Sequence, residues 1–319
     1  MSGHGFTSAF AAQLDAYLEF KQSMGFCGAS RTWYLQQFDA WCAGRGRTVL
    51  DQATVEEWVA ARLESSGRYR SWMSYIRDFG RWLQATGHPG AYVLSDRWKA
   101  SFIPPRPYLL TRREIDGFFT VAAALDTSSP WRWQAAAFFT LMHSCGLRTG
   151  ETRALKTAHV DLHSEDIDIV WSKGNRSRRL PVTPQVADVL ARCDKESRAR
   201  FPGRVNFFVS GTGNQVTGAT VASVFARVWD QAGLARPLAD RQPVPYALRH
   251  HFAYACIERW RALGKDVHAM LPYLSRYMGH ASFDSTYYYI HKLSGIASAG
   301  RRNRRSAAHR IAGTKFRPS

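Results

Sequence analysis

The sequence predicts two domains: an all-helical domain of four helices, then a mixed α+β domain that is mainly helical and has a small antiparallel sheet. Four apolar stripes with helical spacing fill roughly the first hundred residues. The segment Pro104-Pro105-Arg106-Pro107 cannot continue a helix and favours extended backbone. Strand-like runs then appear within 158–182, between further helical segments. We therefore expect domains at 1–103 and 104–319.

The four stripes of the first domain are rich in aromatic residues, which we interpret as its core. The first two end at Met24-Gly25 and at Gly44, and the fourth ends at Gly87. Thr54, with Glu57 three residues later, predicts the N-cap of the third helix. The stripes are Phe10, Leu14, Tyr17 and Leu18; Tyr34, Leu35, Phe38 and Trp41; Val55, Trp58, Val59 and Leu63; and Trp72, Tyr75, Ile76, Phe79, Trp82 and Leu83.

The second domain should begin with a helix capped by Thr111, because Glu114 stands three residues on. A helix around 131–144 should end at Cys145-Gly146, and another should restart near Gly150. Strands are predicted at 160–162, 167–171, 179–182 and 207–209, with a hairpin turn at Lys173-Gly174-Asn175. Further helices are predicted at 184–199, 217–232, 247–263 and 267–278.

The charge balance points to a polyanionic partner. The chain has a formal net charge of +18 and a pI near 10.1. Residues 1–103 carry a net charge of +2 and residues 104–319 carry +16, with a basic tail at 301–319. Nucleic acid is the commonest partner of such a chain. A membrane surface would require a basic amphipathic helix or a lipid anchor, and we find neither.

Several other classes of protein are disfavoured. The five cysteines are odd in number and include no CxxC pair, which argues against a disulfide scaffold and a cysteine zinc site. No stretch approaches the roughly 20 apolar residues of a membrane span. The first residues lack a basic start followed by an apolar run, so we expect no secretory leader. We expect a cytoplasmic protein.

Four separated segments carry candidate chemistry, although each alone is a weak signal. Arginine, lysine, histidine and tyrosine recur in them. These residue types can bind a phosphate, transfer a proton or act as a nucleophile. The segments are Gly146-Leu147-Arg148-Thr149-Gly150-Glu151, Ser172-Lys173-Gly174-Asn175-Arg176-Ser177-Arg178-Arg179-Leu180-Pro181, Tyr246-Ala247-Leu248-Arg249-His250, and Tyr277-Met278-Gly279-His280 followed by Ser285-Thr286-Tyr287-Tyr288-Tyr289-Ile290-His291.

In this order and at these spacings, the segments resemble the tyrosine recombinase, or phage integrase, family. The resemblance covers the whole chain in layout and is specific at motif level over 146–291. It implies that Arg148 and Arg249 are the catalytic arginines and that Glu151 is an accessory acid. It also implies that Lys173 is the lysine of the hairpin turn, that His280 belongs to the LGH segment, and that Tyr289 is the nucleophile. The register of nine residues after His280 favours Tyr289 over Tyr287 and Tyr288.

One position departs from the family pattern, because Tyr246 stands where the HxxRH motif begins with histidine. A phenol can donate a hydrogen bond to a phosphate oxygen, but it is not a readily protonated base near neutral pH. We still expect activity, with Tyr246 in the site. Always-charged arginine forks suit the two non-bridging oxygens of a phosphodiester. A lysine on a mobile turn can protonate the leaving 5′ oxygen.

The resemblance also implies the larger organisation. The first domain would be a SAM-like four-helix core-binding domain and the second the catalytic domain, holding duplex DNA without a metal or other cofactor. We expect Arg176, Arg178 and Arg179 to contact DNA phosphates. Assembly would be a homotetramer on DNA or a complex with sister recombinases. The segment 267–277 looks like members carried on bacterial transposons, which suggests a transposase-type integrase of a mobile element that acts at the nucleoid.

Three alternatives remain open from the sequence. The first is an enzyme like type IB topoisomerases, which use related chemistry without pairing two sites. The second is a catalytically impaired DNA-binding member of the family, which the substitution at Tyr246 keeps open. The third is a basic RNA-binding protein, although no segment resembles an RNA module.

Overall fold

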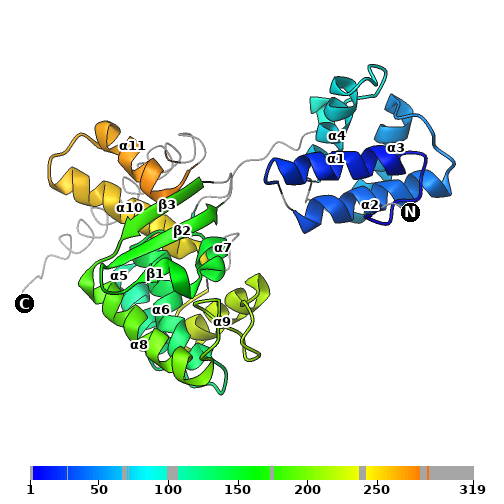
Figure 1. Ribbon diagram of the computed structural model, residues 1–319. Coiled ribbons are helices and arrows are strands. Elements are labelled where there is room, and N and C mark those ends of the chain that lie inside the picture. Colours follow the sequence, from blue (N-terminus) through cyan, green and yellow to red (C-terminus); the bar gives the residue numbers. More distant parts are fainter. Residues whose placement is uncertain are drawn as a thin grey trace, which may run out of the picture. The chain divides into compact units, whose positions relative to one another are not determined.

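The computed structural model of the chain describes residues 3–26, 28–66, 70, 72–98, 107–172, 176–236, 242–280 and 286. The chain divides into two compact units, Met1–Pro104 and Pro105–Ser319. Each unit has its own apolar core, and Figure 1 shows the elements of both. The predicted two-domain fold class, all-helical and then mixed, is confirmed.

The first unit consists of the four helices that the apolar stripes predict. They are α1 (Ala11–Ser23), α2 (Ala29–Gly44), α3 (Gln52–Ser66) and α4 (Met73–Ala85), followed by a short 3-10 helix at Asp96–Trp98. Aromatic residues from the stripes fill the core, as expected: Tyr17, Phe38, Trp58, Trp72 and Phe79 are all buried. A row of buried residues every three or four positions places one face of each helix against its neighbours.

The predicted N-cap of the third helix was wrong. Helix α3 begins at Gln52, and Asp51 rather than Thr54 receives the first-turn hydrogen bond. The backbone N–H of Thr54 donates to Oδ1 of Asp51 at 2.8 Å, while the Thr54 side chain is buried. Aspartate is as good a capping residue as threonine, and here it lies three residues earlier.

Buried Asp39 of α2 ties the start of the chain to this unit. Its carboxylate accepts hydrogen bonds from the backbone N–H groups of Thr7, at 2.6 Å, and Ser8, at 3.0 Å. The hydroxyl of Thr7 donates to the same carboxylate at 3.2 Å. Backbone donors therefore satisfy a carboxylate that is only 2% exposed.

The second unit alternates helices with one small sheet. Strands β1 (Val160–Asp161), β2 (Asp166–Ser172) and β3 (Arg176–Pro181) form an antiparallel sheet in that order. The predicted antiparallel sheet is thus confirmed, and the predicted turn at 173–175 lies outside the described residues. The remaining elements are α5 (Arg112–Ala123), α6 (Trp131–Ser144), α7 (Thr149–Ala154), a 3-10 helix (Thr157–His159), α8 (Pro184–Arg200), α9 (Gly218–Gln231), α10 (Tyr246–Ala262) and α11 (Val267–Met278).

The register of β2 and β3 assigns each residue to one face of the sheet. Ile167 pairs with Leu180, and both are buried in the core. Asp168 pairs with Arg179 on the opposite, more exposed face. Because side chains alternate along a strand, Arg178 lies on the same face as Leu180.

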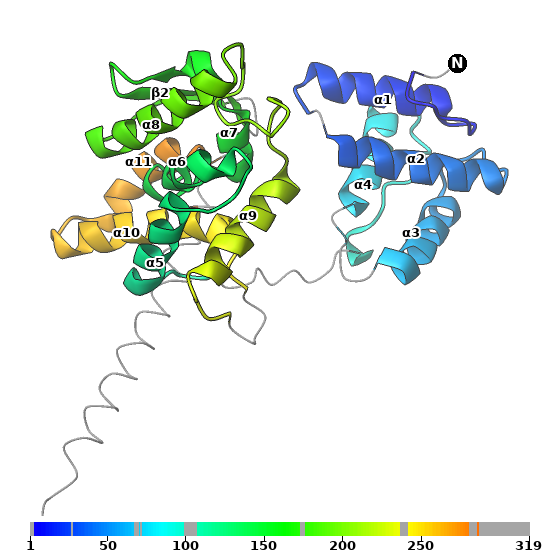
Figure 2. The same ribbon diagram turned by 90° about the horizontal axis from the view of Figure 1, so that it is seen from below.

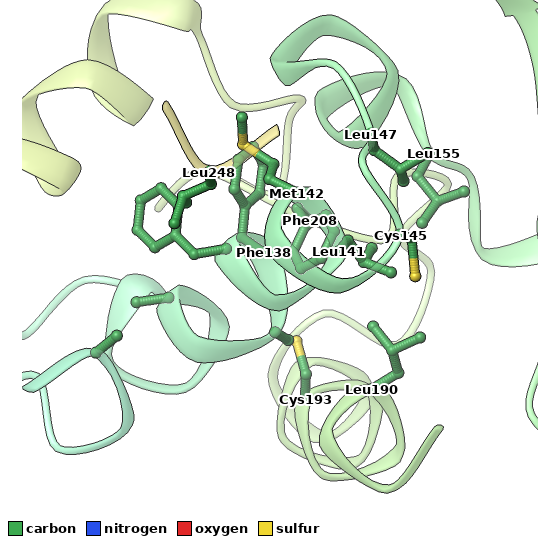
Figure 3. Close-up of a cluster of buried hydrophobic side chains, with 14 of the residues drawn as sticks. Phe138, Leu141, Met142, Cys145, Leu147, Leu155, Leu190, Cys193, Phe208 and Leu248 are labelled. Atoms are coloured by element: carbon green, nitrogen blue, oxygen red, sulfur yellow. The ribbon is translucent and has the colours of Figure 1, made fainter. Parts of the chain in front are cut away.

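Helix α6 is the centre of the second unit. It packs against α5, α7, α8 and α10, and Figure 2 shows these helices around it. Figure 3 shows its side chains in the core, together with residues that flank the candidate site. Leu147 and Leu155 stand at either end of α7, and Leu248 precedes Arg249; all three are buried in this cluster. The core therefore packs directly against two of the motif segments, the one that contains Arg148 and the one that contains Arg249.

The predicted strand at 207–209 was wrong. The segment forms only isolated bridges, between Lys156 and Asn206 and between Val209 and Gln215. The backbone N–H of Phe207 donates to the Leu155 carbonyl at 2.9 Å, and that of Val209 donates to Oε1 of Gln134 at 2.7 Å. A loop and a buried side chain thus take the hydrogen bonds that a neighbouring strand would have made.

None of the helices in the described residues is both long and apolar enough to cross a membrane.

Candidate active site

The first arginine is held at the start of α7 by a tight turn. Gly146 has φ +62°, and a Cβ built there would lie 2.4 Å from the ring of Phe252, so only glycine fits. The backbone N–H of Arg148 donates to Oε2 of Glu151 at 2.9 Å, which caps the helix. Nη1 of Arg148 donates to Oε1 of the same carboxylate at 2.7 Å. Glu151 therefore fixes both the backbone and the side chain of Arg148.

The second arginine, Arg249 on α10, is fully buried. Nη1 donates to the carbonyl of Gly146, and Nη2 donates to the carbonyl of Met278 at 2.9 Å. Nη1 also lies 3.9 Å from Oε2 of Glu151. Arg249 thus joins the turn before α7 to the end of α11.

A third arginine, Arg178 on β3, reaches the same carboxylate. Nη1 and Nη2 donate to Oε1 and Oε2 of Glu151 at 3.1 and 2.9 Å, a two-pronged contact. Its Nε donates to the carbonyl of Tyr277 at 2.8 Å. Strand β3 and helix α11 lie near one another in Figure 1, and this contact joins them.

The end of α11 completes the cluster. Gly279 has φ +66° and ends the helix, and its carbonyl accepts from Nη2 of Arg148 at 2.6 Å. The next residue, His280, is 6% exposed, and its Nδ1 lies 2.6 Å from Oγ1 of Thr286. Burial, aided by nearby arginine charges, lowers the pKa of His280 to about 3. Its imidazole is therefore neutral near pH 7 and contributes hydrogen bonds without charge.

Electrostatics define what this cluster can bind. Burial raises the pKa of Glu151, but the hydrogen bonds and charges of Arg178 and Arg148 outweigh that effect, so the pKa is lowered. Within the described residues, three guanidinium groups thus surround the single carboxylate of Glu151, so positive charge is in excess among these four side chains. Buried positive charge in excess, presented by planar donors, suits a phosphate group.

The remaining predicted residues stand in different relations to the cluster. Tyr246 is the first residue of α10; it is 38% exposed, and its ring lies edge-on to that of His250 at 4.7 Å. Arg179 forms an exposed ion pair with Asp168 at 2.9 Å, on the other face of the sheet from Arg178. Arg176 begins β3. Lys173 and Tyr289 lie outside the described residues.

The structure therefore brings together Arg148, Glu151, Arg178, Arg249 and His280 from four distant segments. Our sequence reasoning did not anticipate that backbone carbonyls would hold these arginines, or that Thr286 would contact His280. Among the described residues, no three histidine, cysteine, aspartate or glutamate side chains gather as metal ligands.

Comparisons with known proteins identify the family of the chain. The profile of the phage integrase family matches residues 110–295, more than half of the chain. The putative integrase/recombinase y4rE of Sinorhizobium fredii is 32% identical over 191 residues, which cover 59% of this chain and 60% of that protein. Tyrosine recombinase XerD of Ralstonia nicotianae is 27% identical over 269 residues, covering 81% of this chain and 80% of XerD.

The fold is also that of a solved integrase. The structure of the Tn1549 transposon integrase in complex with circular intermediate DNA matches with a TM-score of 0.59 at 17% identity. The match covers 87% of this chain and 94% of that one. With the family profile extending over the arginine cluster, the resemblance noted in the sequence is confirmed: the chain belongs to the phage integrase family of tyrosine recombinases.

Proposed function

We propose that this chain is a site-specific DNA recombinase that cuts and rejoins DNA through a 3′-phosphotyrosine intermediate. The observation that carries the proposal is the cluster around Glu151, in which guanidinium groups from three separate elements meet. A surface charge cluster would not need to be buried or to be assembled from such distant segments. A site that must bind one phosphate from several sides requires both burial and donors from distant segments.

The charge of the cluster suits the reaction. A phosphodiester carries one negative charge, and a second develops on its non-bridging oxygens when an oxygen nucleophile attacks phosphorus. The excess of positive charge in the cluster matches this transition state better than it matches the ground state. Interactions that strengthen in the transition state are the ones that accelerate a reaction. In comparable sites, losing one such donor lowers the rate about 100- to 1000-fold.

The reacting groups are assigned by the family pattern. Tyr289 reacts as the phenolate, which nearby positive charge favours and whose proton passes to solvent; its oxygen attacks phosphorus and forms the phosphotyrosine bond, while the bond to the 5′ oxygen breaks. Lys173 gives that oxygen its proton. Arg148 and Arg249 hold the non-bridging oxygens, with His280 as a neutral hydrogen-bonding group and Tyr246 as a further donor. Attack of a 5′ hydroxyl on the phosphotyrosine reverses the step, so rejoining needs no ATP.

We assign the duplex contacts chiefly to the second unit, because it carries most of the net charge. Arg176 and Arg179 on β3 are candidate phosphate contacts near the hairpin turn. The active assembly is a homotetramer on two DNA sites or a complex with sister recombinases, acting at the bacterial nucleoid. The match to a transposon integrase supports a role in moving a mobile element.

The decisive test is covalent trapping on DNA. Full-length protein is incubated with a pool of nicked duplexes of randomised sequence, and protein-linked strands are recovered after denaturation with detergent. The nick lets the short fragment that bears the new 5′ hydroxyl diffuse away, so the covalent intermediate accumulates. We expect Tyr289→Phe to form no adduct while retaining DNA binding, because the nucleophile alone is removed.

Tyr287→Phe and Tyr288→Phe are the matched controls, since each removes one hydroxyl from a neighbouring position. Both should form the adduct. A normal adduct yield from Tyr289→Phe would contradict the assignment of the nucleophile. Failure of the wild type to form any adduct would favour a DNA-binding member without catalysis. Relaxation of any supercoiled plasmid, without recombination, would favour topoisomerase-like activity.

A further inference from the structure

Arg178 has a different environment from its neighbours on β3. Ser177 and Arg179 are exposed, whereas the Arg178 side chain is only 10% exposed. Arg178 shares its face of the sheet with Leu180, which is 1% exposed. An arginine that points toward a core must have partners for its charge and its donors.

The partners of Arg178 form a closed ring of contacts. The two oxygens of Glu151 accept from both Arg178 and Arg148. Arg148 also holds the carbonyl of Gly279, and Arg178 holds the carbonyl of Tyr277, two residues earlier. The ring thus runs from β3 through α7 to the end of α11 and back to β3.

We propose that Arg178 is a positioning residue for the recombination reaction: it holds Glu151 and the end of α11 so that Arg148 is presented to the scissile phosphate. This inference rests on the proposed function. It differs from the phosphate contact that the sequence suggested for Arg178, because one N–H on each of its three nitrogens is already engaged inside the protein.

Exposure separates the two arginines on this carboxylate. The Arg148 side chain is 21% exposed, about twice as much as that of Arg178. Arg148 is therefore the better placed to meet DNA, and Arg178 is the more enclosed of the two. Without Arg178, Glu151 would keep its contact with Arg148 but lose the fork that fixes the plane of its carboxylate. Arg148 would then swing with Glu151.

The contacts of Arg178 require the geometry of an arginine side chain and not only its positive charge. Lysine would preserve the positive charge at position 178, but it has a single nitrogen and cannot bridge both oxygens of Glu151 while reaching the Tyr277 carbonyl. A residue that acted on phosphate by charge alone would tolerate this change. A residue that positions Glu151 would not.

The test uses two substrates that differ only at the scissile group. One is a duplex recovered by covalent trapping, and the other carries a methylphosphonate there, which replaces one non-bridging oxygen with a methyl group and is uncharged. Arg148→Ala should lose about 100- to 1000-fold in cleavage on the phosphate and much less on the methylphosphonate. Arg178→Ala should lose about 10- to 100-fold in cleavage of the phosphate substrate, and its loss should also be much smaller on the methylphosphonate substrate.

Further variants sharpen the result. Arg178→Lys should be nearly as slow as Arg178→Ala, and Arg148→Ala combined with Arg178→Ala should be no slower than Arg148→Ala alone. Arg200→Ala, which removes an exposed arginine paired with Glu196, should cleave like the wild type. Equal losses of Arg178→Ala on the two substrates would reduce Arg178 to a stabilising contact. Additive losses in the double variant, or full activity of Arg178→Lys, would also overturn the proposal.

A measurement on the protein alone keeps the two proposals apart. The unfolding free energies of Arg178→Ala, Glu151→Gln and the double variant should be non-additive, because the two side chains share two hydrogen bonds. If the wild type forms no adduct but this coupling is present, the proposed recombinase function is rejected, while the contact between Arg178 and Glu151 is supported. If the wild type is active and the coupling is absent, the positioning role fails.

Discussion

Gly279 lies where any side chain would disturb both the backbone and the arginine cluster. Its φ of +66° belongs to the left-handed region, and its carbonyl accepts from Arg148. A Cβ at this position would stand 2.7 Å from Nη1 of Arg178 and 3.4 Å from Nη1 of Arg148. Gly279→Ala therefore tests how tightly the geometry of the cluster controls cleavage.

The two effects of Gly279→Ala have different magnitudes and different readouts. Placing alanine in the left-handed region costs about 1 kcal/mol, which lowers the melting temperature of a domain of this size by about 2–4 °C. The Arg178 guanidinium must also retreat by several tenths of an ångström and carry Glu151 with it. Misplacement of a catalytic group by about 1 Å costs about 100-fold in rate, so we expect cleavage to fall about 10- to 100-fold.

Gly264→Ala is the matched control. Gly264 has the same φ of +66°, but a Cβ there meets nothing within 4 Å. Both variants should lose similar stability in a thermal unfolding scan, while only Gly279→Ala should lose covalent adduct formation on a trapped duplex. If Gly279→Ala cleaved as fast as Gly264→Ala, the reasoning that the cluster tolerates no displacement would be refuted.

Two further predictions concern stability. His280 binds a proton near pH 6.5 when unfolded but only near pH 3 when folded, so the free energy of unfolding should fall as the pH drops below about 6.5. Urea titrations at pH 7 and pH 5 should show a loss about 2 kcal/mol smaller in His280→Asn; equal losses would contradict this. Asp39→Ala should lower the unfolding free energy by about 3 kcal/mol, because the backbone N–H groups of Thr7 and of buried Ser8 lose their acceptor. Denaturation followed by tryptophan fluorescence would measure this, and wild-type stability of Asp39→Ala would refute it.

The helices were predictable because their signals are local. An apolar residue every three or four positions specifies a helix and its buried face whatever lies elsewhere in the chain. The capping box at the start of α5 is confirmed for the same reason: Thr111 Oγ1 accepts from the Glu114 backbone at 3.2 Å, and the Glu114 carboxylate accepts from the Thr111 backbone at 2.7 Å. The prediction of a strand at 207–209 was wrong because a strand needs a pairing partner, which the local sequence does not reveal.

The burial of the Arg178 side chain could have been predicted from the sequence. Once Leu180 is taken as buried in β3, alternation along the strand places Arg178 on the inner face and Arg179 on the outer one. Grouping the basic residues of this strand together as DNA contacts passed over that alternation. What alternation cannot supply is the partner, because Glu151 lies 27 residues away in the sequence.

The carbonyl groups that hold the arginines explain features of the motifs that charge alone does not. Arg249 and Arg148 donate to the carbonyls of Gly146, Met278 and Gly279, so part of each guanidinium is fixed before DNA arrives. Two of these carbonyls belong to glycines with positive φ, a backbone conformation that turns the carbonyl where a residue with a side chain would be strained. The backbone at Gly146 and Gly279 is therefore part of the proposed phosphate site. It orders the donors in advance, and donors already in place need no reorganisation when charge develops on the phosphate.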